Sequence, residues 1–291
     1  MAVTGANGRL GRALLDALGR EEIEAIPWYR ADYDLDDPGA AARVVEGGRP
    51  DTVIHSAAWT DVDGCARDPT RAMRRNAEAV GELADSCAGK GVRLVVMSTN
   101  EVFDGQRTDG LGYAESDPPH PINPYGESKL AGERMAQDAF DRAGRSDDLL
   151  IVRTAWLFGP PGNDFPSKIL KAADALPQGE PLNVVADEVG SPTYSVDLAR
   201  AIVQLVHEGG PGGVYHLVNE GQATRLDVAL RVLGHCRPAR DVAAISRTQF
   251  SRASSPPAWA VLRSSRPAAV EVTLRPWSEA IDAYAPSLCA A

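Results

Sequence analysis

Apolar and polar residues follow one another along this chain in a pattern that predicts strands separated by amphipathic helices. Val3 stands just before a glycine-rich turn, and after the turn Leu10, Leu14 and Leu18 recur every four residues, as on one face of a helix. This alternation favours an α/β fold with a doubly wound parallel sheet. Further strands are predicted at residues 24–29, 52–55, 94–97 and 151–154, and helices at residues 70–90 and from Tyr125 onward.

Beyond residue 154 the alternation weakens, while proline and glycine accumulate at residues 159–162. A short strand is predicted at residues 184–189 and a helix at residues 194–206. The run at residues 214–218 reads as a strand that returns to the main sheet. We therefore expect a first domain at residues 1–155, rejoined by about residues 190–222, and a smaller C-terminal lobe formed mainly by residues 156–291.

The composition excludes some classes of partner. Of 291 residues, 44% are apolar, which supplies an ordinary globular core. The formal net charge of −10 argues against a surface for nucleic acid, which requires a net basic face. No apolar run approaches the roughly 18 residues that a membrane span needs, and no leader precedes the glycine turn. We therefore expect a cytoplasmic protein with small-molecule partners.

The four cysteines are scattered and form no CxxC pair. This spacing favours reduced, structural thiols over metal ligands or disulfides, and no metal site is predicted. The residues concerned are Cys65, Cys87, Cys236 and Cys289.

The run TGANGRLG, residues 4–11, places Gly5, Gly8 and Gly11 three residues apart. Glycines in such a turn let the backbone approach a pyrophosphate closely, and the free N–H groups at the start of the following helix bind it. The apolar residue before the turn and the helical stripe after it favour a dinucleotide site. A structural turn that binds nothing is the alternative.

The residue after the second predicted strand bears on cofactor choice. An acidic residue there takes the ribose 2′-hydroxyl of NAD, whereas an arginine accommodates the 2′-phosphate of NADP. Arg30 occupies this place and favours NADP(H), while Asp32, Asp34 and Asp36 leave NAD(H) open. Asp34 and Leu35 could instead face the adenine.

Small residues follow the third predicted strand, where Ala57 and Ala58 would leave clearance beside a pyrophosphate or allow tight helix packing. Ser98 and Thr99 follow the buried strand at residues 94–97, at the end where open α/β sheets bind ligands. Hydroxyl groups at this position serve either catalysis or the capping of a loop.

Tyr125 and Lys129 stand four residues apart at the start of a predicted helix and so share one face. A lysine cation beside a phenol stabilises the phenolate, so we expect Lys129 to lower the pKa of Tyr125 and make it usable in proton transfer. An exposed pair without function is the alternative.

With these residues in place, the chain resembles the extended short-chain dehydrogenase/reductases. Within them it is most similar, from end to end, to the dTDP-4-dehydrorhamnose reductase family of nucleotide-sugar reductases. The segments that carry the resemblance are AAWTDVDGC (residues 57–65), STNEVFDG (98–105), NPYGESKLAGE (123–133), RTAWLFG (153–159), GSPT (190–193) and GVYHLVNEG (213–221).

The resemblance implies an NADP(H)-dependent reduction of a nucleotide-linked keto-deoxysugar in deoxysugar biosynthesis, on a Rossmann-type sheet, and it allows a homodimer. The implied catalytic residues are Thr99, Tyr125 and Lys129: the tyrosine protonates the carbonyl oxygen, the threonine binds it, and the lysine tunes the phenol and holds the ribose. The implied cofactor contacts are Gly5, Asn7, Gly8, Arg9, Leu10, Arg30, Asp34, Leu35, Ala57, Ala58, Asn76, Ser98, Tyr125 and Lys129. The implied substrate contacts are Thr60, Val62, Asn100, Glu101, Phe103, Trp156 and Asn163.

The chain departs from the family pattern where Asn100 and Glu101 follow the threonine in place of the usual Asp-Tyr. An acidic second residue is also found in nucleotide-sugar 4,6-dehydratases, although Asn100 cannot act as the acid that they place first. The run SSPPAWAVL, residues 254–262, also replaces an Arg-Pro pair common in the family. A dehydratase or epimerase with tightly held NAD therefore stays open, as does a non-catalytic subunit on the same fold.

Overall fold

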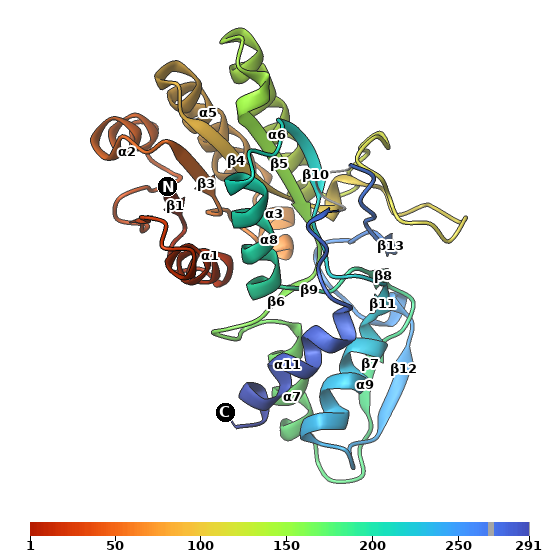
Figure 1. Ribbon diagram of the computed structural model, residues 1–291. Helices are drawn as coiled ribbons and strands as arrows, with labels where there is room; N and C mark the ends of the chain where they lie inside the picture. Colours follow the sequence, from red (N-terminus) through yellow and green to blue (C-terminus); the bar gives the residue numbers. More distant parts are fainter. Residues whose placement is uncertain (267–270, 291) are drawn as a thin grey trace.

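The computed structural model describes residues 1–266 and 271–290. Its centre is a six-stranded sheet in which every pairing is parallel (Figure 1). The strand order β2–β1–β3–β4–β5–β10 reverses direction between β1 and β3, so a crevice opens at the carboxyl ends there. The strands are β1 (Ala2–Thr4), β2 (Ile26–Trp28), β3 (Thr52–His55), β4 (Arg93–Thr99), β5 (Leu149–Thr154) and β10 (Gly213–His216).

Helices cover both faces of this sheet (Figure 1). On one face, α1 (Arg9–Arg20) and α8 (Ser195–His207) bury Leu14, Leu18 and Ile202 against the strands. On the other face lie α2 (Ala40–Gly48), α5 (Ala79–Lys90) and α6 (Pro124–Arg142). The predicted doubly wound parallel α/β fold is confirmed, and β10 pairs with β5 as the run at residues 214–218 predicted.

The helix predicted at residues 70–90 is divided into three segments. It comprises α4 (Pro69–Met73), a π-helical segment (Arg74–Glu78) and α5, and α3 (Val62–Arg67) precedes it. Gly132 of α6 lies so close to the π-helical segment that a Cβ there would be 2.3 Å from the Asn76 carbonyl oxygen. The π-helical segment therefore packs closely against α6, the helix that carries Tyr125.

The C-terminal lobe is built from separated segments around a core that includes Ile169, Val232 and Ile281. Its helices are α7 (Phe165–Ala175), α9 (Arg225–Cys236) and α11 (Trp277–Cys289). The single strand predicted at residues 184–189 is wrong, because the chain leaves β7 after Val185 and enters β8 at Val189. The short strands are β6 (Leu157–Phe158), β7 (Leu182–Val185), β8 (Val189–Gly190), β9 (Thr193–Tyr194), β11 (Ala223–Thr224), β12 (Val242–Ile245) and β13 (Trp259–Ala260), and short 3₁₀ turns span Asn100–Val102, Ser146–Asp148 and Arg247–Gln249.

The prediction of four reduced cysteines is wrong for one pair. Cys236 at the end of α9 and Cys289 at the end of α11 form a disulfide, with Cα atoms 5.1 Å apart. Their separation of 53 residues gave no sign of this, because packing of α9 against α11 brings them together. Cys65 and Cys87 are free and buried. Within the described residues, no helix combines the length and apolar character needed to cross a bilayer.

Candidate active site

A cavity of about 1120 Å³ lies between the carboxyl edge of the sheet and the C-terminal lobe. Residues from the glycine turn, from the ends of β3 and β4 and from α6 line one side of it. Residues from α7 and α9 line the other side. Most residues that the sequence predicted to act together therefore meet in one cavity.

The glycine turn has the shape that a dinucleotide phosphate needs. Gly5 has a φ of +64°, and a Cβ there would lie 2.9 Å from the backbone nitrogen of Ala57. A Cβ on Gly11 would lie 2.2 Å from the Gly5 carbonyl oxygen, so this glycine lets α1 pack directly against the turn. Gly8 precedes the first turn of α1 and lines the cavity without a side-chain cap. The N–H groups at this helix start are therefore available to an anion.

Most of the predicted cofactor contacts line the cavity, and one of them, Arg9, also bonds the backbone of the C-terminal lobe. Its guanidinium donates to the carbonyl oxygens of Gly159 (3.2 Å) and Gly162 (2.8 Å), so its side chain ties α1 to the loop before α7. The predicted cofactor contacts that line the cavity are Gly5, Asn7, Gly8, Arg9, Leu10, Arg30, Asp34, Leu35, Ala57, Ala58, Ser98, Tyr125 and Lys129.

Arg30 lies two residues beyond β2 with 73% of its side chain exposed. Its Nε lies 3.8 Å from the Asp34 carboxylate, a loose contact that leaves donors for another anion. The neighbouring acids are held by local turns, since Asp32 accepts from the Tyr29 N–H and Asp34 from the Asp36 N–H. This arrangement favours a phosphate over a ribose hydroxyl as the partner of Arg30.

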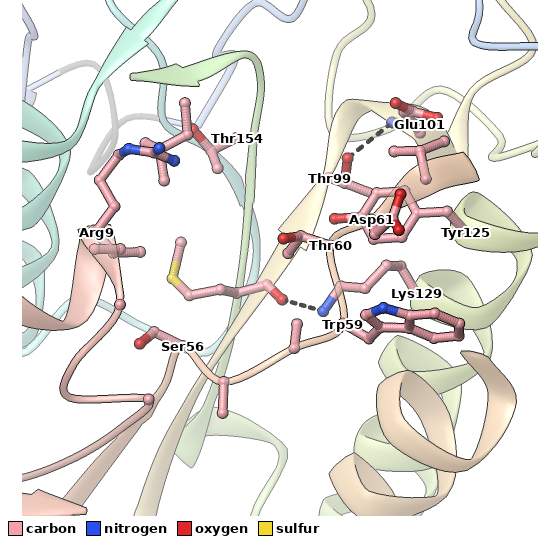
Figure 2. A pocket seen from close by; sticks show the side chains of 18 of the residues that line it. Arg9, Ser56, Trp59, Thr60, Asp61, Thr99, Glu101, Tyr125, Lys129 and Thr154 are labelled. Atoms are coloured by element: carbon pink, nitrogen blue, oxygen red, sulfur yellow. Dashed lines mark hydrogen bonds between the residues drawn. The ribbon is translucent and has the colours of Figure 1, made fainter. Parts of the chain in front are cut away.

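Figure 2 shows Thr99, Tyr125 and Lys129 side by side at the end of β4. Asn123 caps α6 by accepting from the Gly126 N–H at 2.9 Å, which places Tyr125 in the first turn. The Lys129 ammonium donates to the Met97 carbonyl oxygen at 2.7 Å. The trio is therefore fixed by a strand end, a helix cap and a buried hydrogen bond.

The prediction that Lys129 lowers the pKa of Tyr125 is wrong for the protein without a cofactor. Burial raises the pKa of Tyr125, the charge of Glu101 adds to this, and a hydrogen bond with Thr99 only partly offsets it. Burial also lowers the pKa of Lys129 to about 8, against the opposing influence of Glu133. The Lys129 ammonium bonds the Met97 carbonyl oxygen instead, and the phenol, whose pKa is raised, stays protonated and able to donate its proton.

Two predicted contacts do not line the cavity. Asn76 is fully buried: its amide oxygen accepts from the Trp59 N–H at 2.8 Å, and its amide nitrogen donates to the Trp59 carbonyl and to Ser128. It fixes the loop after β3 and does not line the cavity. Phe103, predicted to contact substrate, is buried instead in a stack with Tyr113, with ring centroids 4.3 Å apart. Six predicted substrate contacts do line the cavity: Thr60, Val62, Asn100, Glu101, Trp156 and Asn163.

Ser98 reaches the cavity, but its hydroxyl donates to Glu133 behind the site. Glu133 forms a bidentate pair with Arg153, with nitrogen–oxygen distances of 2.9 and 2.6 Å. Both side chains are almost fully buried, at 2% and 4% exposed. This charge pair supports β4, β5 and α6 directly beneath the trio.

Comparison with known proteins assigns the chain to a family. A family model described as "RmlD substrate binding domain" matches residues 1–289. The chain belongs to this family. It is 36% identical to a dTDP-4-dehydrorhamnose reductase of Mycobacterium tuberculosis H37Rv, over 97% of this chain and 90% of the relative. It is 40% identical to a dTDP-4-keto-6-deoxy-D-glucose reductase of Streptomyces niveus, over 80% of this chain and 78% of the relative. The dTDP-4-dehydrorhamnose reductase of Bacillus anthracis, solved in complex with NADP, gives a TM-score of 0.88 at 31% identity and 98% coverage of both chains.

Sequence reasoning missed several cations that this member of the RmlD family places in the cavity wall. Arg225 begins α9, Lys168 lies on α7, and Arg252 pairs with Asp63 of α3 at 3.2 Å. Each stands in a segment where no motif points to a ligand. Lysine is scarce in this chain, and this scarcity could have drawn attention to Lys168. Arg225 and Arg252 offered no such signal, because the sequence pattern does not encode the contacts between the segments of the lobe.

Proposed function

We propose that this chain is an NADP(H)-dependent reductase of a nucleotide-linked keto-deoxysugar, similar to dTDP-4-dehydrorhamnose reductase, in deoxysugar biosynthesis. The observation that carries the proposal is the meeting of Thr99, Tyr125 and Lys129 with the glycine turn in one cavity. Membership of the RmlD family, and the NADP complex of the Bacillus anthracis relative, support the same assignment.

The residues present fit a dinucleotide. Gly8 and the free N–H groups at the start of α1 would hold the pyrophosphate, and Arg30 would meet the 2′-phosphate. NADP(H), when bound, supplies the hydride for carbonyl reduction. Ala57 and Ala58 leave room for it beside the turn.

Tyr125 is the proton donor in this proposal. Its phenol is protonated at neutral pH, as an ordinary tyrosine is, and burial raises its pKa further. Thr99 shares the site and would donate a hydrogen bond to the carbonyl oxygen of the sugar, where negative charge develops. Lys129, held by the Met97 carbonyl, would bind the ribose. Its positive charge would stabilise the phenolate that forms when Tyr125 donates its proton.

The C-terminal lobe, which residues 156–291 mainly form, would hold the substrate. Its Trp156 and Asn163 line the same cavity as Thr60, Val62, Asn100 and Glu101. The dehydratase alternative is weaker because an amide at Asn100 cannot supply the acid. A homodimer in the cytoplasm that binds no nucleic acid is the setting we propose. A calorimetric titration with NADP⁺ followed by dTDP tests the binding half of the proposal: both should bind, and failure of either would contradict it.

Replacing Arg30 by alanine should weaken NADPH binding while leaving NADH binding nearly unchanged. A charged hydrogen bond contributes about 1.5–3 kcal/mol, so the loss should be roughly ten- to a hundredfold in Kd. Arg142 is a similarly exposed arginine that pairs with Asp85 on the surface and does not line the cavity, so Arg142→Ala is the matched control and should leave both dissociation constants unchanged. Equal dissociation constants for NADPH and NADH in the wild type would exclude the assigned role.

A further inference from the structure

Glu101 and Arg225 come from different lobes and line the same cavity. Glu101 follows Thr99 at the end of β4, and its backbone N–H donates to the Thr99 hydroxyl at 3.2 Å (Figure 2). Arg225 is the first residue of α9. Within the described residues the two side chains form no direct ion pair. Each nevertheless affects the other's charge state, because Arg225 lowers the pKa of Glu101, which burial raises, while Glu101 raises that of Arg225.

The Arg225 guanidinium is held as a rigid plane. Its central carbon lies 3.6 Å from the centre of the Trp156 ring and 5.1 Å from that of Phe165. The Trp156 indole is itself fixed, since a Cβ on Gly190 would lie 2.5 Å from it. Stacking of this kind orients an arginine without consuming its in-plane N–H donors.

Those donors are largely unused. Glu188 approaches the Arg225 Nε only to 3.6 Å, and no closer hydrogen bond to the guanidinium is found within residues 1–266 and 271–290. Arg75, by contrast, bonds both oxygens of Asp36. An oriented guanidinium with free donors in the cavity wall can therefore bond an acceptor on the ligand.

Glu101 is the complementary group. Its Oε2 accepts from the Asn123 amide at 2.7 Å, which orients the carboxyl group, and no hydrogen bond reaches its Oε1 among the described residues. Asn123 stands two residues before Tyr125 at the start of α6, and Glu101 lines the same cavity as Tyr125, so this contact holds the carboxyl group on the side where the carbonyl would be reduced. A group that both donates to Glu101 and accepts from Arg225 would satisfy both residues, and an alcohol does this.

We propose that Glu101 and Arg225, the Glu101–Arg225 clamp, bind the ring hydroxyl next to the reacting carbonyl and make the enzyme selective for sugars that keep it. For a 4-keto-6-deoxyhexose this is the 3-hydroxyl, because the other neighbouring carbon, C5, carries the methyl group. The inference rests on the proposed function and adds the substrate class: 3-hydroxylated, not 3-deoxygenated, 4-keto sugars. A site built to bond a hydroxyl leaves its own polar groups unpaired when the hydroxyl is missing.

The test compares kcat/KM for a dTDP-linked 4-keto-6-deoxyhexose with that for its 3-deoxy and 2-deoxy analogues. Loss of the 3-hydroxyl should lower kcat/KM by about 10²–10⁴-fold, while loss of the 2-hydroxyl should have a much smaller effect. Glu101→Gln and Arg225→Gln should each slow the parent substrate and leave the 3-deoxy analogue nearly unchanged. Arg225→Lys should recover part of the loss, because it keeps the charge without the planar donors.

Arg252→Gln is the matched control, since Arg252 lines the same cavity but is engaged by Asp63. It should change the parent and 3-deoxy substrates by the same factor. Equal kcat/KM for these two substrates in the wild type, or an equal loss for both in the clamp variants, would overturn the inference while leaving the reductase function intact. Absence of NADPH consumption with every keto sugar would refute the proposed function and the clamp together. Thermal melting and the NADPH Kd, expected to stay unchanged, separate these outcomes from misfolding.

Discussion

Replacing Tyr125 by phenylalanine should lower kcat by about 10²–10⁴-fold, the usual contribution of a positioned general acid. The change removes one hydroxyl from a side chain that is 9% exposed and leaves its volume nearly constant. Folding should therefore survive, and so should NADPH binding through the glycine turn and Arg30. Steady-state kinetics with a keto-sugar substrate measures the loss, and the NADPH Kd reports the binding.

Tyr113→Phe is a matched control for this experiment, because the Tyr113 hydroxyl bonds Asp104 outside the cavity. It removes the same atom from a similarly buried side chain. Its kcat should stay close to that of the wild type. If Tyr125→Phe also retains wild-type turnover, the assigned acid is wrong.

Replacing Glu133 by alanine should lower the free energy of unfolding by about 3–5 kcal/mol, because it leaves the Arg153 guanidinium buried without its counter-charge. Arg153 is 4% exposed, and the described residues offer its Nη1 no partner at all. Ser98 would lose its acceptor at the same time. Because Glu133 also raises the pKa of Lys129, the variant should hold a larger share of neutral lysine and turn over more slowly.

Urea unfolding of three proteins tests this argument. The double variant Glu133→Leu/Arg153→Met removes both charges and fills their space, so it should be more stable than Glu133→Ala. A single variant as stable as the wild type, or a double variant less stable than the single one, would contradict the role assigned to this pair.

Local pattern explains what the sequence predicted correctly. The glycine turn, the end of β4 and the four-residue spacing of Tyr125 and Lys129 are short-range features. The parallel sheet brings the carboxyl ends of its strands to one edge, where these features meet. The cavity therefore includes all but two of the predicted site residues. Family resemblance added contacts such as Trp156 that no periodicity identifies.

What the sequence did not predict depends on contacts between distant segments. Asn76, in the π-helical segment, bonds the Trp59 backbone and Ser128 of α6. Phe103 stacks on Tyr113 and does not line the cavity. The disulfide between Cys236 and Cys289 needs two helices to pack side by side, which spacing alone does not encode. Arg225 gains its environment from Trp156 and Phe165, about 60 to 70 residues away in the chain.

The reductase assignment is tested most directly by following NADPH absorbance with a dTDP-linked 4-keto-6-deoxyhexose and identifying the product. The account predicts one NADPH consumed for each sugar converted, a new hydroxyl at the former carbonyl, and a rate that collapses in Tyr125→Phe. Conversion of a nucleotide hexose without net NADPH consumption would contradict it and favour the dehydratase or epimerase alternative.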